Sequence, residues 1–173
     1  MNAPLMALLR LIHILAGIFW LGAILTLAGF LLPAIRGSRI GTGTLWRSVM
    51  QRQRLQLWIN ISMTLAILAG FALYAIDSAA SNGAFARSTP GKTFGLGALF
   101  AIAAAGVMGA MSQPSSRKLA ALADRIDENP GAAIPTDLAT AASALQDRIS
   151  RSLTIASVLL LLSAMTMAIA RYL

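Results

Sequence analysis

The sequence predicts an all-α integral membrane protein, a bundle of four transmembrane helices with a short cytoplasmic helical hairpin between the third and the fourth. Hydrophobic residues make up 57% of its 173 residues and charged residues 12%, which is about half the charged share of an average soluble domain. The mean hydropathy is +0.73. Four apolar runs have about the length that a helix needs to cross roughly 30 Å of hydrocarbon; they cover residues 7–32, 57–76, 93–111 and 153–170.

The first run, residues 7–32, carries the single histidine of the chain, His13. The run is too long for the apolar part of a signal peptide. Pro33 and Arg36 follow it, where a cleavable signal would have small residues. We therefore expect this run to stay in the membrane as the first helix.

The second and third runs differ in their side chains. A basic loop, residues 34–56, leads into the second run, and Trp46 and Trp58 flank its start, where an aromatic belt is expected. The third run is dense in Gly and Ala, which let helices approach closely in lipid, so we expect it to be the central packing helix.

The loop at 77–91 is predicted to be an irregular connection. Three polar residues of the second run are expected to bond to neighbouring helices: Asn60, Ser62 and Thr64.

The loop before the fourth run, residues 113–150, has helical signals of its own. Ser116 is a candidate cap for a helix whose apolar residues share one face, and Pro-Gly at 130–131 is a stop signal. Thr136 is a candidate cap for a second helix, which we expect to continue into the fourth run without a break. These two helices form the predicted hairpin.

The charge distribution predicts the topology. Of the fourteen Lys and Arg residues, ten lie between the first and second runs or between the third and fourth runs, segments that the positive-inside rule places in the cytoplasm. Both termini are then extracytoplasmic, and we expect a multi-pass protein of the bacterial inner membrane. The net charge of +8 comes with no nucleic-acid-binding motif, so the predicted partner is the lipid bilayer and not a nucleic acid.

Several kinds of chemistry have no residues to support them. The chain has no cysteine, which excludes disulfides, thiolate metal sites, iron–sulfur clusters and covalently attached c-type haem. The sequence also lacks a Ser-His-Asp set, paired carboxylates and an HExxH motif. Hydrolase chemistry therefore has no visible machinery.

His13 is the candidate functional residue, because an ionisable side chain within a membrane helix is costly. It lies about six residues into the first run, roughly 9 Å along a helix. The predicted topology brings both chain ends to the same side of the membrane. The candidate site residues there are His13, Arg10, Met165, Met167 and Arg171.

Four interpretations of His13 stay open. In the first, the neutral ring bonds to a neighbouring helix. In the second, the ring is an axial ligand of one b-type haem, Arg10 and Arg171 pair with the propionates, and Gly17 leaves room for the macrocycle. The second axial ligand is then Met165 or Met167, or the iron is five-coordinate.

The third interpretation is a copper site, because imidazole and thioether ligands suit Cu(I). However, Met108 and Met111 belong to the other half of the bilayer. The fourth is a proton relay or a pH sensor formed by His13 with Asp77 or Lys92.

Three stretches carry a family resemblance: "LIHILAGIFWLGA", "RSVMQRQRLQ" and "MAIARYL". The first resembles the first-helix pattern of bacterial membrane proteins of the copper-resistance D type and of the HemJ group of protoporphyrinogen oxidases. The others are similar to small four-helix relatives of that assembly. The resemblance implies a four-helix bundle and haem binding through His13. It also implies a lysine at the third helix, for which Lys92 is the one candidate.

The leading functional hypothesis is an inner-membrane protein that binds a single b-type haem near its outer face through His13. Its role would be electron transfer or haem-linked redox chemistry, with a quinone or a porphyrin as the lipophilic partner. One alternative is a non-catalytic accessory or assembly subunit that contacts other membrane subunits or a second copy of itself. The other alternative is a copper or proton permease. Whether the chain is an enzyme stays open.

Overall fold

The computed structural model describes residues 3–37, 48, 50, 54–127 and 135–173, and this part of the chain is helical without any strand. Four of its helical stretches are long and apolar enough to cross a membrane: Ala3–Ala34, Leu55–Ala80, Thr89–Arg125 and Thr136–Ala170. The prediction of an all-α protein with four membrane-spanning helices is therefore confirmed. Trp46 and the Pro-Gly stop at 130–131 lie outside the described residues.

The helices follow one another with few interruptions. The order is α1 (Ala3–Thr26), the π-helical turn η1 (Leu27–Leu31), α2 (Leu32–Gly37), α4 (Leu55–Ala80), α5 (Ala84–Arg87), α6 (Thr89–Val107), the π-helical turn η3 (Met108–Ser112), α7 (Gln113–Asp127) and α8 (Thr136–Ala170). The short α5 lies inside the connection that the sequence predicts to be irregular.

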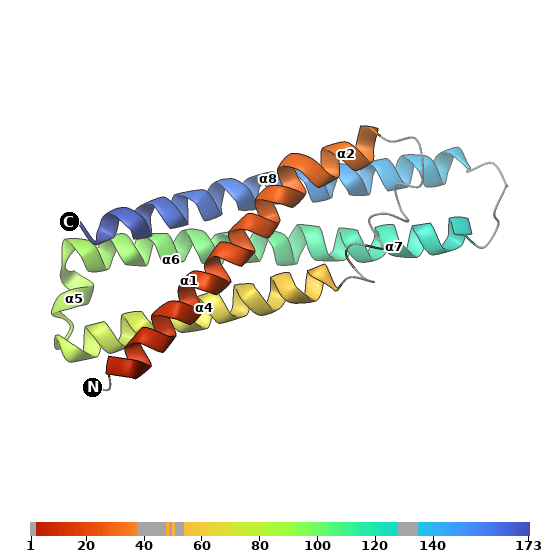
Figure 1. Ribbon diagram of the computed structural model, residues 1–173. Helices are drawn as coiled ribbons and strands as arrows, with labels where there is room; N and C mark the ends of the chain where they lie inside the picture. Colours follow the sequence, from red (N-terminus) through yellow and green to blue (C-terminus); the bar gives the residue numbers. More distant parts are fainter. Residues whose placement is uncertain (1–2, 38–47, 49, 51–53, 128–134) are drawn as a thin grey trace.

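The bundle consists of two helical pairs. α1 packs mainly on α4, and α6 packs mainly on α8. α1 runs obliquely across the others: it begins beside α4 and reaches α8 only in its second half (Figure 1). Both termini and α5 lie at one end of the bundle (Figure 1), which we call the terminal end, and the opposite end is the loop end.

The helix with the most partners is α8. It contacts α1, η1, α6, η3 and α7. The third run was expected to be the central packing helix. Among the long helices, however, α6 packs mainly on α8. Gly106 and Gly109 of the third run are exposed. Its small residues are spread around the helix, whereas α8 concentrates its buried residues on one side.

Close approach of α6 and α8 depends on Gly97. A Cβ atom at this position would stand 2.8 Å from Cγ of Met167 and 2.8 Å from Oγ1 of Thr166. The buried Ser163 hydroxyl donates a hydrogen bond of 2.7 Å to the Gly97 carbonyl oxygen. A small residue and one polar side chain thus join two helices in a medium that supplies no hydrophobic drive between them.

The third run does not end near residue 111, as predicted, but continues as helix to Asp127. Pro114 lies in the first turn of α7, directly after η3. At the end of η3, the Gln113 N–H donates a hydrogen bond to the Met108 carbonyl oxygen, five residues earlier. A proline inside a helix lacks an N–H and its ring clashes with the carbonyl four residues before it. The wider π-helical turn accommodates the proline at this point, so the helix continues without a break.

The first helix has the same arrangement at its loop end. The N–H of Leu32 donates to the Leu27 carbonyl oxygen across η1, and Pro33 follows at once. A π-helical turn followed by a proline therefore occurs in both helices that run from the terminal end to the loop end.

The polar residues of the second run are only in part interhelical. Ser62 and Thr64 donate to carbonyl oxygens of their own helix, those of Trp58 and Asn60, so the expectation of bonds to neighbouring helices is wrong for both. Asn60 does bond across helices, because its Oδ1 atom accepts from Nε2 of Gln113 at 3.4 Å. A hydroxyl in a helix has a carbonyl of its own helix within reach, four residues back.

Candidate functional site

The candidate site is built on a hydrogen bond between α1 and α4. Nδ1 of His13 lies 2.7 Å from the carbonyl oxygen of Ala66. A carbonyl oxygen only accepts hydrogen bonds, so we assign the hydrogen to Nδ1. In the neutral ring, Nε2 then carries the free lone pair, and His13 makes no further hydrogen bond among the described residues. This contact orients the ring, as a hydrogen bond from Nδ1 does in many metal-binding histidines.

Gly70 makes this contact possible. A Cβ atom on Gly70 would stand 2.8 Å from Cε1 of His13 and 3.1 Å from Nδ1. Gly70 lies one helical turn after Ala66, so the two residues share the face of α4 that receives the ring. The sequence shows both small residues, but nothing in it pairs them with a histidine more than fifty positions away.

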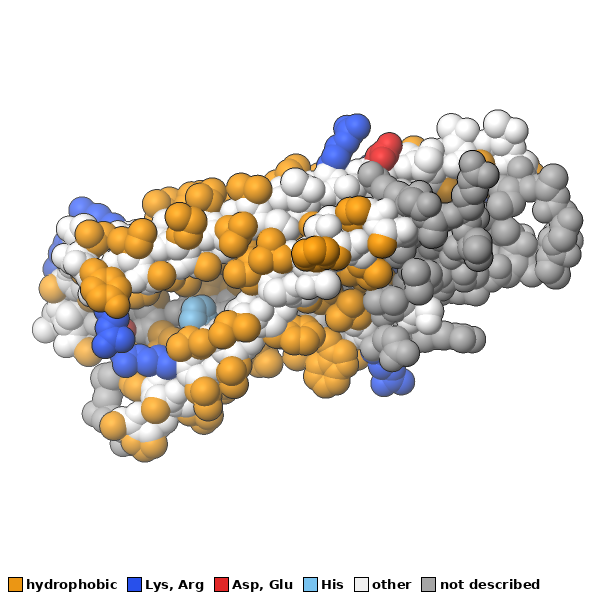
Figure 2. All heavy atoms as spheres, turned by 45° about the horizontal axis from the view of Figure 1, so that its top comes forward, with side chains coloured by type: hydrophobic (Ala, Val, Ile, Leu, Met, Phe, Trp, Pro, Cys, Tyr) orange, Lys and Arg blue, Asp and Glu red, His pale blue; other side chains and the backbone are white. Residues whose placement is uncertain are grey.

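The ring is half-buried and lies at the bottom of a hollow. Figure 2 shows the single pale-blue side chain between α1 and α8, with hydrophobic side chains on both sides of the hollow. A Cβ atom on Gly17, one turn after His13, would meet no atom within 4 Å. Gly17 therefore borders open space, as the haem interpretation requires.

The hollow is closed toward the loop end by apolar side chains. Trp20 is 2% exposed and Ile24 is 0% exposed, and both belong to the core that α1 shares with α4 and α8. Side chains of a helix lean toward its N-terminus, so the Trp20 indole lies over the turn between itself and His13. Its Nε1 atom is buried without a hydrogen-bond partner among the described residues.

An aromatic cluster closes the terminal end between α4 and α6. The rings of Tyr74 and Phe85 meet edge to face with centroids 5.5 Å apart, and those of Phe85 and Phe94 lie 6.2 Å apart. Phe85 belongs to α5, and its backbone N–H donates to the Ser81 hydroxyl. Sequence reasoning missed Phe85 because a single aromatic residue in a loop rich in Ser, Ala and Gly carries no pattern.

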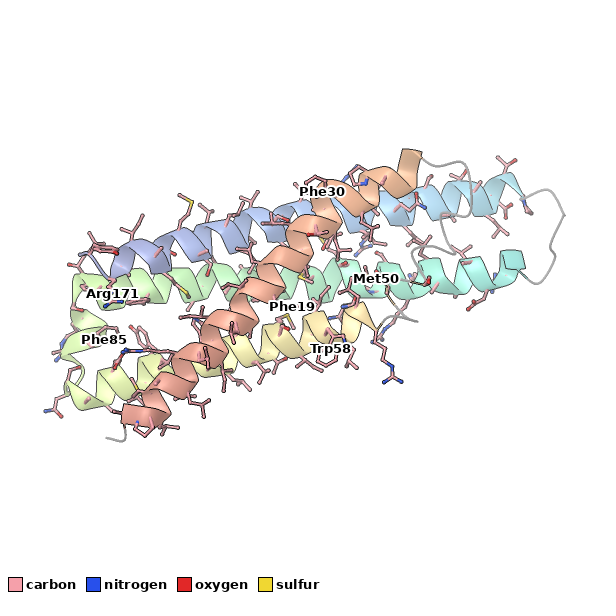
Figure 3. The ribbon with its side chains drawn as sticks, viewed as in Figure 1. Phe19, Phe30, Met50, Trp58, Phe85 and Arg171 are labelled. Atoms are coloured by element: carbon pink, nitrogen blue, oxygen red, sulfur yellow. The ribbon has the colours of Figure 1, made fainter. Side chains whose placement is uncertain are left out.

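The two arginines of the predicted site are exposed and belong to the terminal end of the bundle. Arg10 lies one turn before His13 on α1, and Arg171 follows α8 directly. Figure 3 shows Arg171 at the same end of the bundle as Phe85. Both guanidinium groups are thus available to an anionic ligand at the edge of the hollow.

The two methionines lie on different sides of α8. Met165 is 57% exposed, whereas Met167 is half-buried and contacts the backbone position of Gly97. Residues two apart on a helix are rotated by about 200°, so the two side chains cannot both face the hollow. Met167 lies on the side of α8 that carries its buried residues, and Met165 lies on the opposite side.

The hydrogen bond between His13 and Ala66 of α4 is the contact that the first interpretation of His13 predicts. Among the described residues, no hydrogen bond or ion pair joins His13 to Asp77 or Lys92. The same part of the chain has no group of three His, Cys, Asp or Glu side chains that could hold a metal ion. Met108 is 3% exposed in the core near the loop end, in a different half of the bundle from His13.

Comparison with known proteins adds no relative. No protein-family model, no curated protein and no solved structure matches this chain.

Proposed function

We propose that this protein binds one b-type haem at the terminal end of the bundle, with Nε2 of His13 as an axial ligand to the iron. The observation that carries the proposal is the 2.7 Å contact from Nδ1 of His13 to the Ala66 carbonyl oxygen. It holds the imidazole in one orientation and leaves Nε2 as the ligand atom. The open space at Gly17 supports the proposal, because a flat macrocycle needs room beside its ligand.

The haem would lie with its propionates toward the terminal end. Arg10 and Arg171 are the exposed cations available there, and guanidinium groups pair well with carboxylates. The apolar body of the macrocycle would point toward Trp20, away from water. This orientation matches the charge and polarity of the ligand to those of the hollow.

Met167 is the candidate for the second axial position. It lies on the inner side of α8, and its flexible thioether is a weak ligand that the iron of cytochromes accepts. Met165, which is 57% exposed on the opposite side of α8, has no comparable placement. If Met167 stays against Gly97, where it lies in the structure, His13 would be the one protein ligand of the haem.

A bound haem would serve electron transfer or haem-linked redox chemistry, with a quinone or a porphyrin as the lipophilic partner. We place the protein in the bacterial inner membrane, with the terminal end outside the cytoplasm and the α7–α8 hairpin inside it. The basis for this orientation is the excess of Lys and Arg in the two loops at the loop end.

We favour a one-sided site over a permease. Between His13 and the loop end, many core side chains are apolar and at most 2% exposed, among them Trp20, Ile24, Ile59 and Leu153, although the core also holds buried serines such as Ser152. Copper ions or protons would need a continuous polar path through this core. The accessory-subunit alternative predicts a colourless protein that copurifies with a larger complex.

The spectrum of the purified protein tests the proposal. After expression with haem supply, wild type is expected to show a Soret band at about one haem per chain, and His13→Ala to lose it. His13→Gln is the matched control, because glutamine can still donate to the Ala66 carbonyl oxygen but offers no imidazole to the iron. A colourless wild type, or a band that both variants retain, would overturn the proposal.

A further inference from the structure

We infer that the ligand of His13 enters and leaves through the side of the bundle, from the hydrocarbon of the bilayer, between the terminal halves of α1 and α8. This inference rests on the proposed haem site and adds the route by which the site is filled. It makes the haem exchangeable with the membrane, so the protein takes up its haem from the lipid after it has folded.

The oblique course of α1 creates the opening. Arg10, Gly17 and Leu21 of α1 and Ala28 of η1 follow one side of the first membrane-spanning stretch at helical spacing. Leu21 and Ala28 pack against the core, whereas a Cβ on Gly17 would meet nothing. The same side of the helix is therefore covered in its second half, where α1 contacts α8, and uncovered beside His13 (Figures 1 and 2).

Side chains occupy other directions around the ring. Trp20 and Ile24 fill the core toward the loop end, with exposed fractions of 2% and 0%. The cluster of Tyr74, Phe85 and Phe94 joins α4, α5 and α6 at the terminal end. On the side of α4, the His13 ring itself lies against Ala66 and Gly70.

The opening faces hydrocarbon and not water. Gly17 lies fourteen residues after Ala3, the start of the membrane-spanning stretch, or about 21 Å along the helix axis. Around the rest of its circumference, α1 exposes large apolar side chains at this depth: Leu11 55%, Ile14 54% and Ile18 64%. The helix is therefore surrounded by lipid here, and a ligand that reaches it from the lipid needs an apolar body.

Arg10 sets the direction of entry. It lies on the same side of α1 as Gly17, about 10 Å nearer the terminal end. An amphiphilic ligand that slides in from the lipid keeps its carboxylates at the level of Arg10 while its apolar ring reaches Nε2 of His13. A water-soluble ligand would gain nothing from this arrangement.

The experiment measures haem loading within one bilayer. The full chain, free of haem, is reconstituted into vesicles whose lipid already contains haem, with or without haem-free albumin in the water to trap any haem that leaves. The initial growth of the Soret band is expected to be the same in both cases. Gly17→Leu narrows the open space and is expected to slow loading by about ten-fold, the effect of a barrier near 1.4 kcal/mol, with the same Soret absorbance as wild type at completion. A lower absorbance at completion would mean that the leucine blocks the site itself, and would count against lateral entry.

Gly22→Leu is the matched control. A Cβ at Gly22 also meets nothing within 4 Å, but Gly22 lies on the side of α1 opposite His13, so this variant should load like wild type. Loading that albumin abolishes, or equal slowing by both variants, would overturn lateral entry and leave the haem site standing. No Soret band under any condition would instead refute the haem site, and lateral entry with it.

Discussion

Gly70 and His13 fit each other across the α1–α4 interface: the imidazole fills the space that a side chain on Gly70 would take, with Cε1 2.8 Å from the Cβ position. The ring donates to the Ala66 carbonyl oxygen one turn earlier on α4. One glycine and one carbonyl oxygen therefore determine where the imidazole lies. The proposed haem site and the packing of the first helical pair depend on the same contact.

Gly70→Ala is expected to lower both stability and haem content. The added methyl group displaces the ring, and overpacking of this kind costs about 1–3 kcal/mol, more than the gain in helix propensity from glycine to alanine. Thermal unfolding in detergent and the Soret absorbance per chain measure the two effects. Gly106→Ala, where a Cβ meets nothing within 4 Å, should leave the haem content unchanged.

Arg10→Gln and Arg171→Gln are each expected to weaken haem binding by up to about five-fold, because exposed ion pairs contribute at most about 1 kcal/mol. The effect should shrink as salt is raised, since salt screens exposed charges. Haem titration of the apoprotein at low and high salt is the measurement. Arg87→Gln removes an exposed arginine of α5 that bonds to the Asn82 carbonyl oxygen and should not alter affinity.

Met167→Leu is expected to change the coordination of the haem iron, whereas Met165→Leu should leave it unchanged. Leucine keeps the apolar volume of methionine but offers no sulfur ligand. Electron paramagnetic resonance and the visible spectrum of the oxidised protein report the spin state. Identical spectra for wild type and Met167→Leu would show that the thioether is not a ligand.

Ser163→Ala is expected to destabilise the α6–α8 pair without affecting the haem. Its hydroxyl donates at 2.7 Å to the Gly97 carbonyl oxygen from a site only 5% exposed. Interhelical hydrogen bonds in membranes contribute about 0.6 kcal/mol on average and less than about 2 kcal/mol. Unfolding in mixed detergents should show a loss of this size, while the Soret band of the folded fraction stays the same.

Reporter fusions test the proposed orientation. A periplasmic reporter at either terminus should be active, and one inserted between residues 38 and 47 should be inactive, because ten of the fourteen Lys and Arg residues lie between the first and second or between the third and fourth apolar runs. The reverse result would place His13 near the cytoplasmic face. The proposed contacts of the haem propionates would then lie in the wrong compartment.

The sequence predicts the membrane helices well because each depends on local properties. Length and hydropathy identify four spanning helices, and those four occur in the structure. The local stop signals are less reliable. Pro114 was expected to lie outside the third helix, but the π-helical turn from Met108 to Ser112 carries the helix through it, because the backbone can widen where a proline lacks its N–H.

The candidate site, like the helices, could be predicted from the sequence only in part. That His13 lies within a membrane helix follows from the sequence, and so does the presence of Arg10 and Arg171 at the same end of a four-helix topology. The choice between Met165 and Met167 required the rotation of α8, because depth alone places both at the level of His13. Phe85 and the closure of the terminal end were not foreseen, since they depend on how α5 folds onto α4 and α6.

The amino-acid sequence by itself determined that this protein is a helical membrane bundle with one imidazole in its apolar interior, because hydropathy, length and charge act residue by residue. Only the tertiary structure decided what surrounds that imidazole. The Ala66 carbonyl oxygen and Gly70 come from a helix more than fifty residues away, and the open side at Gly17 arises from the angle at which α1 crosses its neighbours. Such distances and angles result from the packing of whole helices, which no local pattern encodes.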